Sequence, residues 1–311
     1  MLSAASKTFF HFLAGNQGLQ RLASRYGMAS PTGFARRFIA GETVEEAIEA
    51  ARGLEGRGLS QTLDYLGESA DTLEEADNAT GMYGQILDRI VESGIGRNIS
   101  LKLTQLGLDV SREAALANLR RILEPGRTHG FFVRIDMENS PYTDATFEIF
   151  QALWADGFTN LGVVLQSALF RTTQDLPRVV GLGARVRLVK GAYKEPAEIA
   201  YQRKADVDAA YVMQMQYLLS NGTFPALATH DVEIIDAAKA FVAKEGIGKE
   251  RFEFQMLYGV RRDLQAALVK EGYGVRVYVP FGRQWFPYFM RRLGERPANV
   301  AFVLKSLASE K

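Results

Sequence analysis

Hydrophobic and polar residues alternate along several short segments of the chain, and longer segments with a helical repeat separate them. Helical patterns run, for example, over 73–92, 111–123, 144–155, 195–219 and 232–244. The candidate strands begin near Leu59, Ile99, Phe131, Asn160, Ala184, Phe224, Phe252 and Val275. Eight strands that alternate with helices, without a long linker, predict an α/β fold of the (β/α)₈ barrel type.

A doubly wound sheet is the alternative arrangement for this pattern. The glycine-rich pieces 181–183 and 246–248 precede strands, whereas a dinucleotide fingerprint follows one, so we interpret them as turns that end helices. Thr43 and Glu46 have the spacing of a capping box, which predicts a helix before the first strand. We therefore expect an N-terminal helical region over 1–56 and a barrel domain over 57–311.

The two faces of each predicted strand differ in polarity. Ile and Leu alternate with Ser, Lys and Thr over 99–104, and Val alternates with Arg and Tyr over 275–279. Successive side chains of a strand point to opposite faces. In a barrel the apolar face meets the outer helices, so the polar face points inward. Inward-pointing charges are expected at Asp64, Arg134, Arg185, Glu253 and Arg276.

The position of a polar residue along its strand decides how we interpret it. Charges inside a barrel need partners, and for Arg134, Arg185 and Glu253 a structural ion network is an equal alternative to a functional role. The catalytic mouth of such barrels lies at the carboxyl ends of the strands. At or near that end lie Lys102, Asp136, Gln166, Arg187, Lys190, Gln255 and Tyr278.

The final predicted helix, from about Gln284 to Gly294, follows the eighth strand and could close over this mouth. At about 100° per residue, one face carries Tyr288, Arg291, Arg292 and Glu295, while the opposite face is apolar. A free amino acid needs such groups, with Arg for its carboxylate and an acid for its amine. A solvated surface helix is the alternative.

Composition excludes several classes of chemistry. The absence of cysteine rules out disulfides, thiolate metal sites and cysteine nucleophiles. The three histidines, His11, His129 and His230, are far apart in sequence, which argues against a histidine-built metal site. A net charge of +1 argues against a nucleic-acid partner. The remaining cations, amides and phenol predict binding of an anionic cofactor and a small anionic substrate, with the cofactor carrying the difficult chemistry.

The N-terminal segment is basic. No Asp or Glu occurs before Glu42, and a start of this kind suits a transit peptide, a membrane-surface segment or the first helix of a soluble enzyme, which we favour. No apolar run approaches the roughly 18 residues of a spanning helix. We expect a bacterial cytoplasmic protein, with peripheral association with the inner membrane as an option, rather than a mitochondrial one.

Together, several segments resemble the proline dehydrogenase family, and they occur in the family's order from about Arg36 onward. They are LDYLGE (63–68), SLKLTQLG (100–107), VRIDMENS (133–140), LQSALFRT (165–172), RLVKGAYKEP (187–196), ATHD (228–231), FEFQMLYGV (252–260) and YFMRRLGERPANV (288–300). The resemblance implies a distorted barrel with non-covalent FAD across the strand ends. It also implies oxidation of L-proline to Δ1-pyrroline-5-carboxylate by hydride transfer to the flavin, and reoxidation by a membrane quinone. A separate pyrroline-5-carboxylate dehydrogenase is then expected downstream.

The resemblance also implies roles for individual residues. Arg291, Arg292 and Lys102 would hold the substrate carboxylate, and Glu295 would face the amine. The ring would be lined by Leu257, Tyr278 and Tyr288, with Asp136 supporting Lys102 or the ring pocket. The alternatives are a purely structural Lys102–Asp136 pair and core positions for Leu257 and Tyr288. Arg187 would lie beside flavin N5 and Gln166 at the pyrimidine edge. Further flavin contacts are expected from Val189, Lys190, Gly191, Ala192, Thr229, His230, Gln255 and Arg292.

Two other functions fit the residues. The first is a Schiff-base lyase on the same barrel, with Lys102 or Lys190 as nucleophile. The second is a barrel without enzymatic activity whose charged final helix binds a partner protein. That alternative does not explain inward-facing polar residues at several strand ends.

Overall fold

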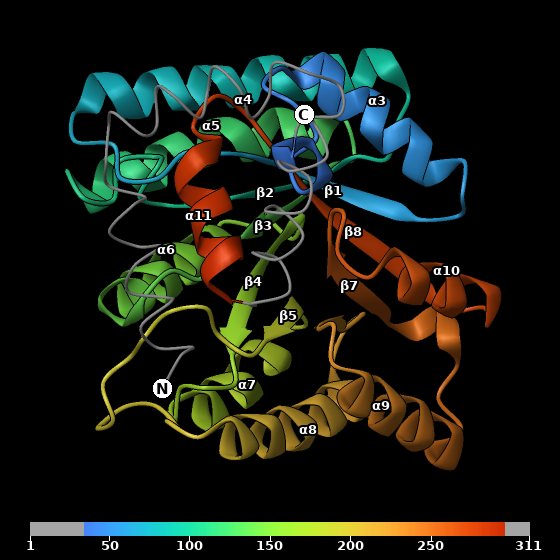
Figure 1. Ribbon diagram of the computed structural model, residues 1–311. Helices are drawn as coiled ribbons and strands as arrows, with labels where there is room; N and C mark the ends of the chain where they lie inside the picture. The colour runs from blue at the N-terminus through green and yellow to red at the C-terminus, as the bar shows by residue number, and fades with distance from the viewer. Residues whose placement is uncertain (1–33, 296–311) are drawn as a thin grey trace.

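Eight parallel strands close into a barrel in chain order, as the computed structural model in Figure 1 shows. The structure describes residues 34–295, and the side chains up to Met290. The strands are β1 (Ser60–Tyr65), β2 (Asn98–Leu101), β3 (Phe132–Ile135), β4 (Leu161–Gln166), β5 (Arg185–Val189), β6 (Ala226–Ala228), β7 (Glu253–Leu257) and β8 (Gly274–Phe281). The predicted TIM-type barrel is confirmed.

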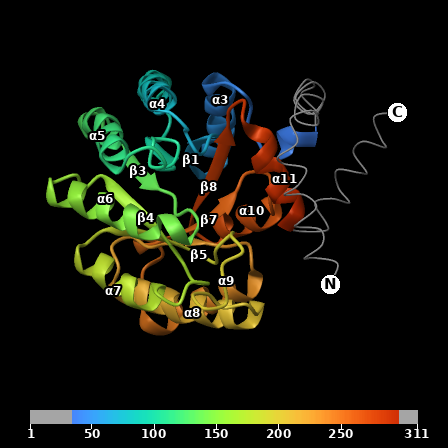
Figure 2. The same cartoon turned by 90° about the vertical axis from the view of Figure 1, so that its left-hand side faces the viewer.

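Helices surround the barrel, as Figure 2 shows from the side. They are α3 (Val44–Glu55), α4 (Leu73–Ser93), α5 (Arg112–Thr128), α6 (Thr143–Ala155), α7 (Thr172–Gly181), α8 (Lys204–Asn221), α9 (Val232–Glu245), α10 (Arg262–Lys270) and α11 (Trp285–Glu295). Short 3₁₀ helices are η1 (Phe34–Arg37), η2 (Ser140–Tyr142) and η3 (Lys249–Arg251). Within residues 34–295, no helix combines the length and the apolar character that a membrane span requires.

The alternating strand pattern predicts correctly which side chains enter the barrel. Val133 and Leu101 are fully buried among the apolar residues that pack against the outer helices. The alternating polar positions Ser100, Arg134 and Arg187 are buried as well, on the inner side. Closure depends on six paired residues of β1 and β8, from Ser60 with Arg276 to Tyr65 with Phe281. This register brings the first and last strands together at the mouth.

Helix ends follow the sequence signals in two cases. The Thr43 hydroxyl accepts from the backbone N–H of Glu46, and the Glu46 carboxylate accepts from that of Thr43, so the predicted capping box opens α3. Gly246 ends α9 with φ 66°, in the left-handed region that glycine adopts without a Cβ penalty. The glycine-rich piece 246–248 is therefore a helix-ending turn, as predicted.

The predicted helix over 195–219 is wrong at its start, because α8 begins at Lys204. Residues 190–203 instead form a connection that pairs with the segment after β4. Ala200 forms an antiparallel bridge with Leu169, and the Phe170 N–H donates to the Ile199 carbonyl at 3.0 Å. These backbone groups are used between segments, so they are not available to a helix.

A second apolar cluster holds α11 in place. Trp285 and Phe289 are fully buried, and they pack with Phe38 and with Leu66, which directly follows β1. The Trp285 indole Nε1 donates to Glu42 Oε1 at 3.1 Å. In Figure 1, α11 lies in front of the strands, so this cluster fixes the last helix beside the barrel mouth.

Candidate active site

Asp136 joins two of the predicted site residues at the carboxyl ends of the strands. Its Oδ1 accepts a hydrogen bond from Arg187 Nη1 at 2.6 Å, and its Oδ2 accepts one from the Tyr278 hydroxyl at 2.7 Å. Asp136 follows β3, Arg187 lies on β5 and Tyr278 on β8. Burial and the neighbouring carboxylates Asp136 and Asp64 raise the pKa of Tyr278 far above its ordinary value, so its phenol stays protonated as a donor.

Arg187 has a fixed orientation. Beyond Asp136, its Nε donates to Gln255 Oε1 at 2.5 Å and its Nη2 donates to the Ser100 hydroxyl at 3.0 Å. The guanidinium also lies 5.4 Å from the centre of the Tyr278 ring. Only 4% of Arg187 is exposed, and its partners come from several strands. The structure therefore presents a buried, preorganised cation at the mouth.

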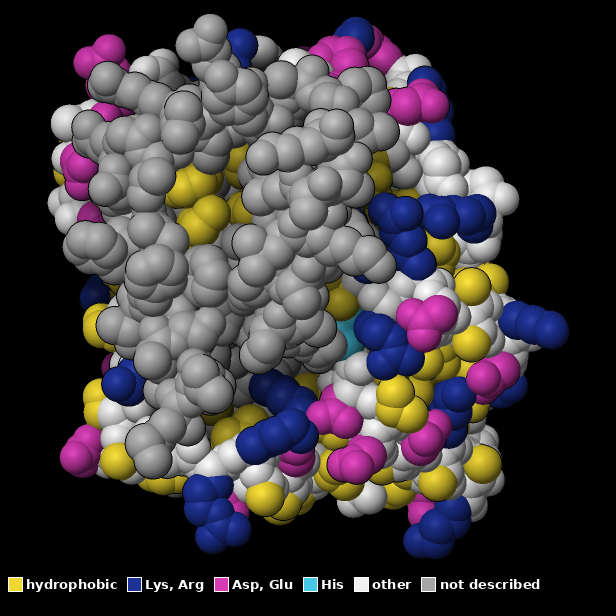
Figure 3. Space-filling model, in the orientation of Figure 1, with side chains coloured by type: hydrophobic (Ala, Val, Ile, Leu, Met, Phe, Trp, Pro, Cys, Tyr) yellow, Lys and Arg dark blue, Asp and Glu magenta, His cyan; other side chains and the backbone are white. Residues whose placement is uncertain are grey.

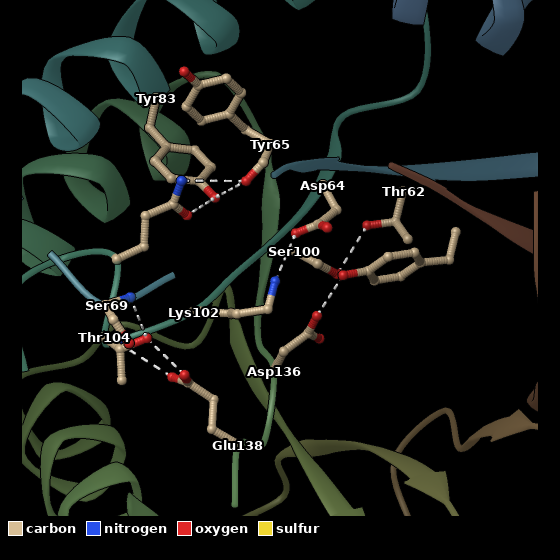
Figure 4. A network of polar contacts seen from close by, with 12 residues as sticks. Thr62, Asp64, Tyr65, Ser69, Tyr83, Ser100, Lys102, Thr104, Asp136 and Glu138 are labelled. Carbon is tan, nitrogen blue, oxygen red and sulfur yellow. Dashed lines mark hydrogen bonds and ion pairs between the residues drawn. The ribbon is translucent and has the colours of Figure 1, made fainter. Parts of the chain in front are cut away.

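Lys102 lies directly after β2 and forms an ion pair with Asp64 of β1, with Nζ 3.7 Å from Oδ1. Figure 4 shows Asp64 and Lys102 directed toward one another, with Asp136 beyond them. Burial lowers the pKa of Lys102, but attraction by Asp64 and then Asp136 outweighs burial and raises it. Lys102 is therefore paired with Asp64 and not with Asp136. Asp136 instead accepts hydrogen bonds from Arg187 and Tyr278.

The residues predicted to contact a flavin lie around β4 to β7. Gln166 Nε2 donates to the Glu138 carbonyl at 3.0 Å. Gly191 has φ 112°, and a Cβ there would lie only 3.2 Å from Gln166 Oε1. The Thr229 hydroxyl accepts from the Asp231 N–H at 3.1 Å, and His230 Nε2 accepts from the Leu257 N–H at 2.9 Å. Val189 is half-buried and Ala192 is exposed.

Lys190 lies at the end of β5 between two carboxylates. Its Nζ is 2.5 Å from Asp208 Oδ1 of α8 and 2.7 Å from Asp231 Oδ2, which precedes α9. Lys204 also contacts Asp231, at 3.1 Å. Partial burial opposes ionisation of Asp231, but the two lysines outweigh burial and lower its pKa to about 2. Lys190 is therefore held in place by two ion pairs at the edge of the mouth.

The structure tests only part of the prediction for the two faces of α11. Phe286, Phe289 and Met290 are buried, which confirms the apolar face, and Tyr288 is only 7% exposed among them. The α11 backbone runs to Glu295. The side chains of Arg291, Arg292 and Glu295 lie outside the described residues, so their roles stay predictions. Leu257 is half-buried at the end of β7.

Glu138 belongs to the mouth but was not predicted. It is 5% exposed, and its carboxylate accepts from the Thr104 hydroxyl at 2.6 Å and the Thr104 N–H at 3.2 Å. Burial raises its pKa, against these hydrogen bonds. The strand alternation that gave Arg134 and Asp136 would have reached Glu138 if it had been continued two residues further.

The charges near the opposite end of the barrel have structural partners. Arg134 Nη1 donates to the Arg185 carbonyl at 2.7 Å, and both guanidiniums lie about 5 Å from the Phe132 ring, at 4.8 and 5.1 Å. Glu253 Oε1 accepts from Arg276 Nε at 2.8 Å and from Gln255 Nε2 at 2.6 Å. Backbone carbonyls and aromatic rings thus hold Arg134 and Arg185 in place of the expected ion network. Glu253 does form an ion pair, with Arg276, and connects through Gln255 to Arg187.

Metal and nucleic-acid sites receive no support within the described residues. No group of three His, Asp or Glu side chains in residues 34–295 is placed to hold a metal ion. On the face shown in Figure 3, the described Lys and Arg side chains are mixed with Asp and Glu, in keeping with the net charge of +1. The mouth brings together charges and amides from several strands.

Comparison with known proteins agrees with this arrangement. Residues 47–305 match the family described as proline dehydrogenase. Proline dehydrogenase 1 of Bacillus subtilis strain 168 is 43% identical over 298 residues, covering 96% of this chain and 97% of that protein. Proline dehydrogenase of Deinococcus radiodurans is 43% identical over 277 residues, covering 88% and 89%.

A solved structure shares the fold but belongs to a longer protein. The structure of proline utilization A from Bdellovibrio bacteriovorus, inactivated by N-propargylglycine, superimposes with a TM-score of 0.80 at 25% identity. That match covers 98% of this chain but only 40% of the other. With a family match across 47–305 and relatives that align along nearly their full length, this chain belongs to the proline dehydrogenase family.

Proposed function

We propose that this protein oxidises L-proline to Δ1-pyrroline-5-carboxylate with bound FAD. The observation that carries the proposal is the 43% identity to proline dehydrogenase 1 of Bacillus subtilis over 97% of that protein's length. Because the alignment extends over nearly all of both chains, the strand ends that build the mouth are included in it. Among the predicted positions, Lys102, Arg187 and Tyr278 lie at these strand ends, which supports the proposal.

The described residues fit a flavin dinucleotide. Arg187 offers a buried guanidinium oriented by Gln255, and Gln166 offers a buried amide at the end of β4. Gly191 has no side chain where a Cβ would crowd Gln166, which leaves the backbone open to a close ligand. Residues assigned to FAD are Gln166, Arg187, Val189, Lys190, Gly191, Ala192, Thr229, His230, Gln255 and Arg292. When bound, FAD supplies the acceptor for the hydride that leaves the proline ring carbon.

The residues of the chain bind and orient the substrate. Lys102, Arg291 and Arg292 attract the carboxylate, and Glu295 attracts the amine. Tyr278 forms part of the ring pocket, held by its hydrogen bond to Asp136. Leu257 and Tyr288 complete the lining. Asp136 already accepts hydrogen bonds from Arg187 and Tyr278, so we assign it a positioning role and expect the amine proton to leave to solvent.

The lyase alternative is less favoured by the electrostatics. A Schiff-base nucleophile must lose its proton, but the carboxylates near Lys102 raise its pKa despite burial. Lys190 is held by ion pairs with Asp208 and Asp231, so its amine is already engaged. Both lysines are better suited to binding anions than to attacking a carbonyl carbon.

The remaining partners follow from the proposed reaction. We assign reoxidation to a membrane quinone and use of the product to a separate pyrroline-5-carboxylate dehydrogenase. The enzyme would then act in the cytoplasm with peripheral contact to the membrane. Nucleic acid is not among its expected partners.

The test is an anaerobic visible spectrum of the purified protein after loading with FAD. Addition of L-proline should bleach the flavin bands, and a later quinone analogue should restore them. Flavin bands that persist with L-proline would refute the substrate, while a protein that takes up no FAD would refute the cofactor. Borohydride trapping of a covalent substrate adduct would favour the lyase instead.

A further inference from the structure

Asp64 is a fully buried carboxylate at the centre of the site. It lies on β1, where its backbone pairs with Ser100 of β2 and Pro280 of β8, and its side chain has no exposed surface. Within the described part of the chain, neither oxygen of Asp64 accepts a hydrogen bond. Its ion-pair partner is Lys102, 3.7 Å away. Burial raises the pKa of Asp64, and Lys102 is the strongest influence that opposes burial, ahead of Tyr278 and Arg187, so ionisation of Asp64 depends most on that cation.

Several carboxylates lie near Lys102, and they differ in the hydrogen bonds that they accept from other residues. Asp136 accepts from Arg187 and Tyr278, and Glu138 accepts twice from Thr104. Glu68, which follows β1, also attracts Lys102. Asp64 has the largest effect on Lys102 among these groups and is the carboxylate in ion-pair contact with it.

We propose that Asp64 is a positioning residue that keeps Lys102 charged and directed into the mouth, so that binding of the substrate carboxylate does not weaken in mildly alkaline solution. This inference rests on the proposed function, in which Lys102 contacts the carboxylate of L-proline. Asp64 itself does not touch the substrate. Its effect passes through the charge and the orientation of Lys102.

The physical basis is a balance between burial and attraction. Burial alone favours the neutral amine of a lysine, while a nearby carboxylate favours the ammonium form. For Lys102, the burial effect is the largest single influence on its pKa, and the surrounding carboxylates, led by Asp64, reverse it. If Asp64 is replaced by Asn, burial remains but the main opposing charge is lost. The pKa of Lys102 should then fall, so that the side chain becomes neutral as the pH rises.

The test uses a carboxylate ligand that has no amine, because the amine of L-proline titrates in the same range. Cyclopentanecarboxylate is added as an inhibitor of L-proline-dependent dye reduction by the FAD-loaded enzyme, from about pH 6.5 to about pH 9.5. In Asp64→Asn, the inhibition constant should rise about tenfold per pH unit above the new pKa of Lys102. At high pH this inhibition constant should reach the value measured for the Lys102→Met variant. The inhibition constant of the wild type should not change over the same pH range.

Two further variants separate this role from a structural one. Glu138→Gln removes another buried carboxylate near Lys102 but leaves Asp64, so its inhibition constant should stay flat with pH. Asp64→Asn combined with Lys102→Met should show no pH-dependent rise, because the titrating group is gone. A flat profile for Asp64→Asn, in an enzyme whose wild type reduces flavin with L-proline, would overturn the inference. A wild type that fails with L-proline would refute the proposed function instead.

If the Asp64→Asn variant does not fold, the melting temperatures of Lys102→Met and of the double variant test the inference. Lys102→Met leaves the Asp64 charge buried without its cation, and the added Asp64→Asn change removes that charge. The double variant should therefore melt at a higher temperature than Lys102→Met alone. A double variant that melts at a lower temperature would show that Asp64 and Lys102 are not coupled in this way.

Discussion

Arg187 and Asp136 form an ion pair across the barrel mouth, with Nη1 2.6 Å from Oδ1, although β4 separates their strands. Arg187 is assigned to the cofactor, while Asp136 also holds the hydroxyl of Tyr278, which is assigned to the substrate. The pair therefore connects the two halves of the proposed site. Breaking a buried pair by removing one partner costs about 3–5 kcal/mol, so we expect both residues to be sensitive to change.

The Arg187→Lys variant should weaken FAD binding. Lysine keeps the charge, but it does not have the planar fork that reaches Asp136, Gln255 and Ser100 together. Loss of one charge-assisted hydrogen bond costs about 1.5–3 kcal/mol, which corresponds to a dissociation constant about 10 to 100 times larger. Fluorescence titration of the cofactor-free protein with FAD measures this constant.

Arg134→Lys is the matched control. Arg134 is also buried and inward-pointing, but it donates to the Val163 and Arg185 carbonyls near the other end of the barrel. This variant should lose stability while keeping its affinity for FAD. Equal FAD affinity in Arg187→Lys and the wild type would contradict the placement of Arg187.

The sequence predicts the barrel and its inward polar positions because alternation along a strand depends on local geometry alone. Alternation does not predict which polar side chains contact one another inside the barrel. Whether Lys102 contacts Asp64 or Asp136 depends on strand register and on side-chain rotamers, which only the closed barrel fixes. Glu138 is different, since the same alternation continued past β3 includes it.

The wrong start of α8 has a comparable cause. Glu195 has good intrinsic helix propensity, but its carboxylate accepts from both the N–H and the hydroxyl of Ser140, at 2.9 and 2.5 Å. This contact ties the segment after β5 to the segment after β3. A contact between positions 55 residues apart leaves no periodic signal in the sequence, so local patterns favoured a helix that the tertiary structure does not form.

Tyr278→Phe should lower activity more than it lowers stability. The change removes the hydroxyl that donates to Asp136 Oδ2 but keeps the ring next to Arg187. A hydrogen bond to a charged acceptor contributes about 1.5–3 kcal/mol, so kcat/KM for L-proline should fall about 10- to 100-fold. Steady-state kinetics with an artificial electron acceptor measure the effect.

Tyr211→Phe controls for the loss of a buried phenol. Tyr211 is fully buried on α8, and its hydroxyl donates to the Leu188 carbonyl of β5 at 3.1 Å. This variant should lose about 1 kcal/mol of stability and keep its kcat/KM. If both tyrosine variants keep wild-type kinetics, the assigned role of Tyr278 is wrong.

Asp231→Asn should remove part of the acid sensitivity of the fold. The folded-state pKa of Asp231 is about 2, below the ordinary value of 3.8, because Lys190 and Lys204 outweigh partial burial. A lowered carboxyl pKa contributes stability above the ordinary pKa, and this contribution is lost as the pH falls from about 4 to about 2. Since Lys204 is largely exposed, screening reduces the contribution to about 1–2 kcal/mol.

Urea unfolding at several pH values checks this prediction. Asp231 also caps α9 by accepting from the Glu233 N–H, and asparagine caps about as well, so the substitution isolates the charge. The wild type should lose more unfolding free energy than Asp231→Asn between about pH 4 and about pH 2. Parallel curves for the two proteins would show that the ion pairs with Lys190 and Lys204 contribute no net stability.

Arg291→Ala tests the sequence-based assignment of the last helix. Phe289 and Met290 are buried and hold α11 beside the mouth, while the role of Arg291 rests on the sequence alone. Loss of one partner of a hydrogen-bonded charge pair costs about 2–5 kcal/mol, so the KM for L-proline should rise at least about 30-fold while FAD stays bound. Arg283→Ala is the control, because Arg283 is exposed just before the same helix. If the two variants have the same KM, Arg291 does not hold the carboxylate, and Lys102 with Arg292 would have to do so.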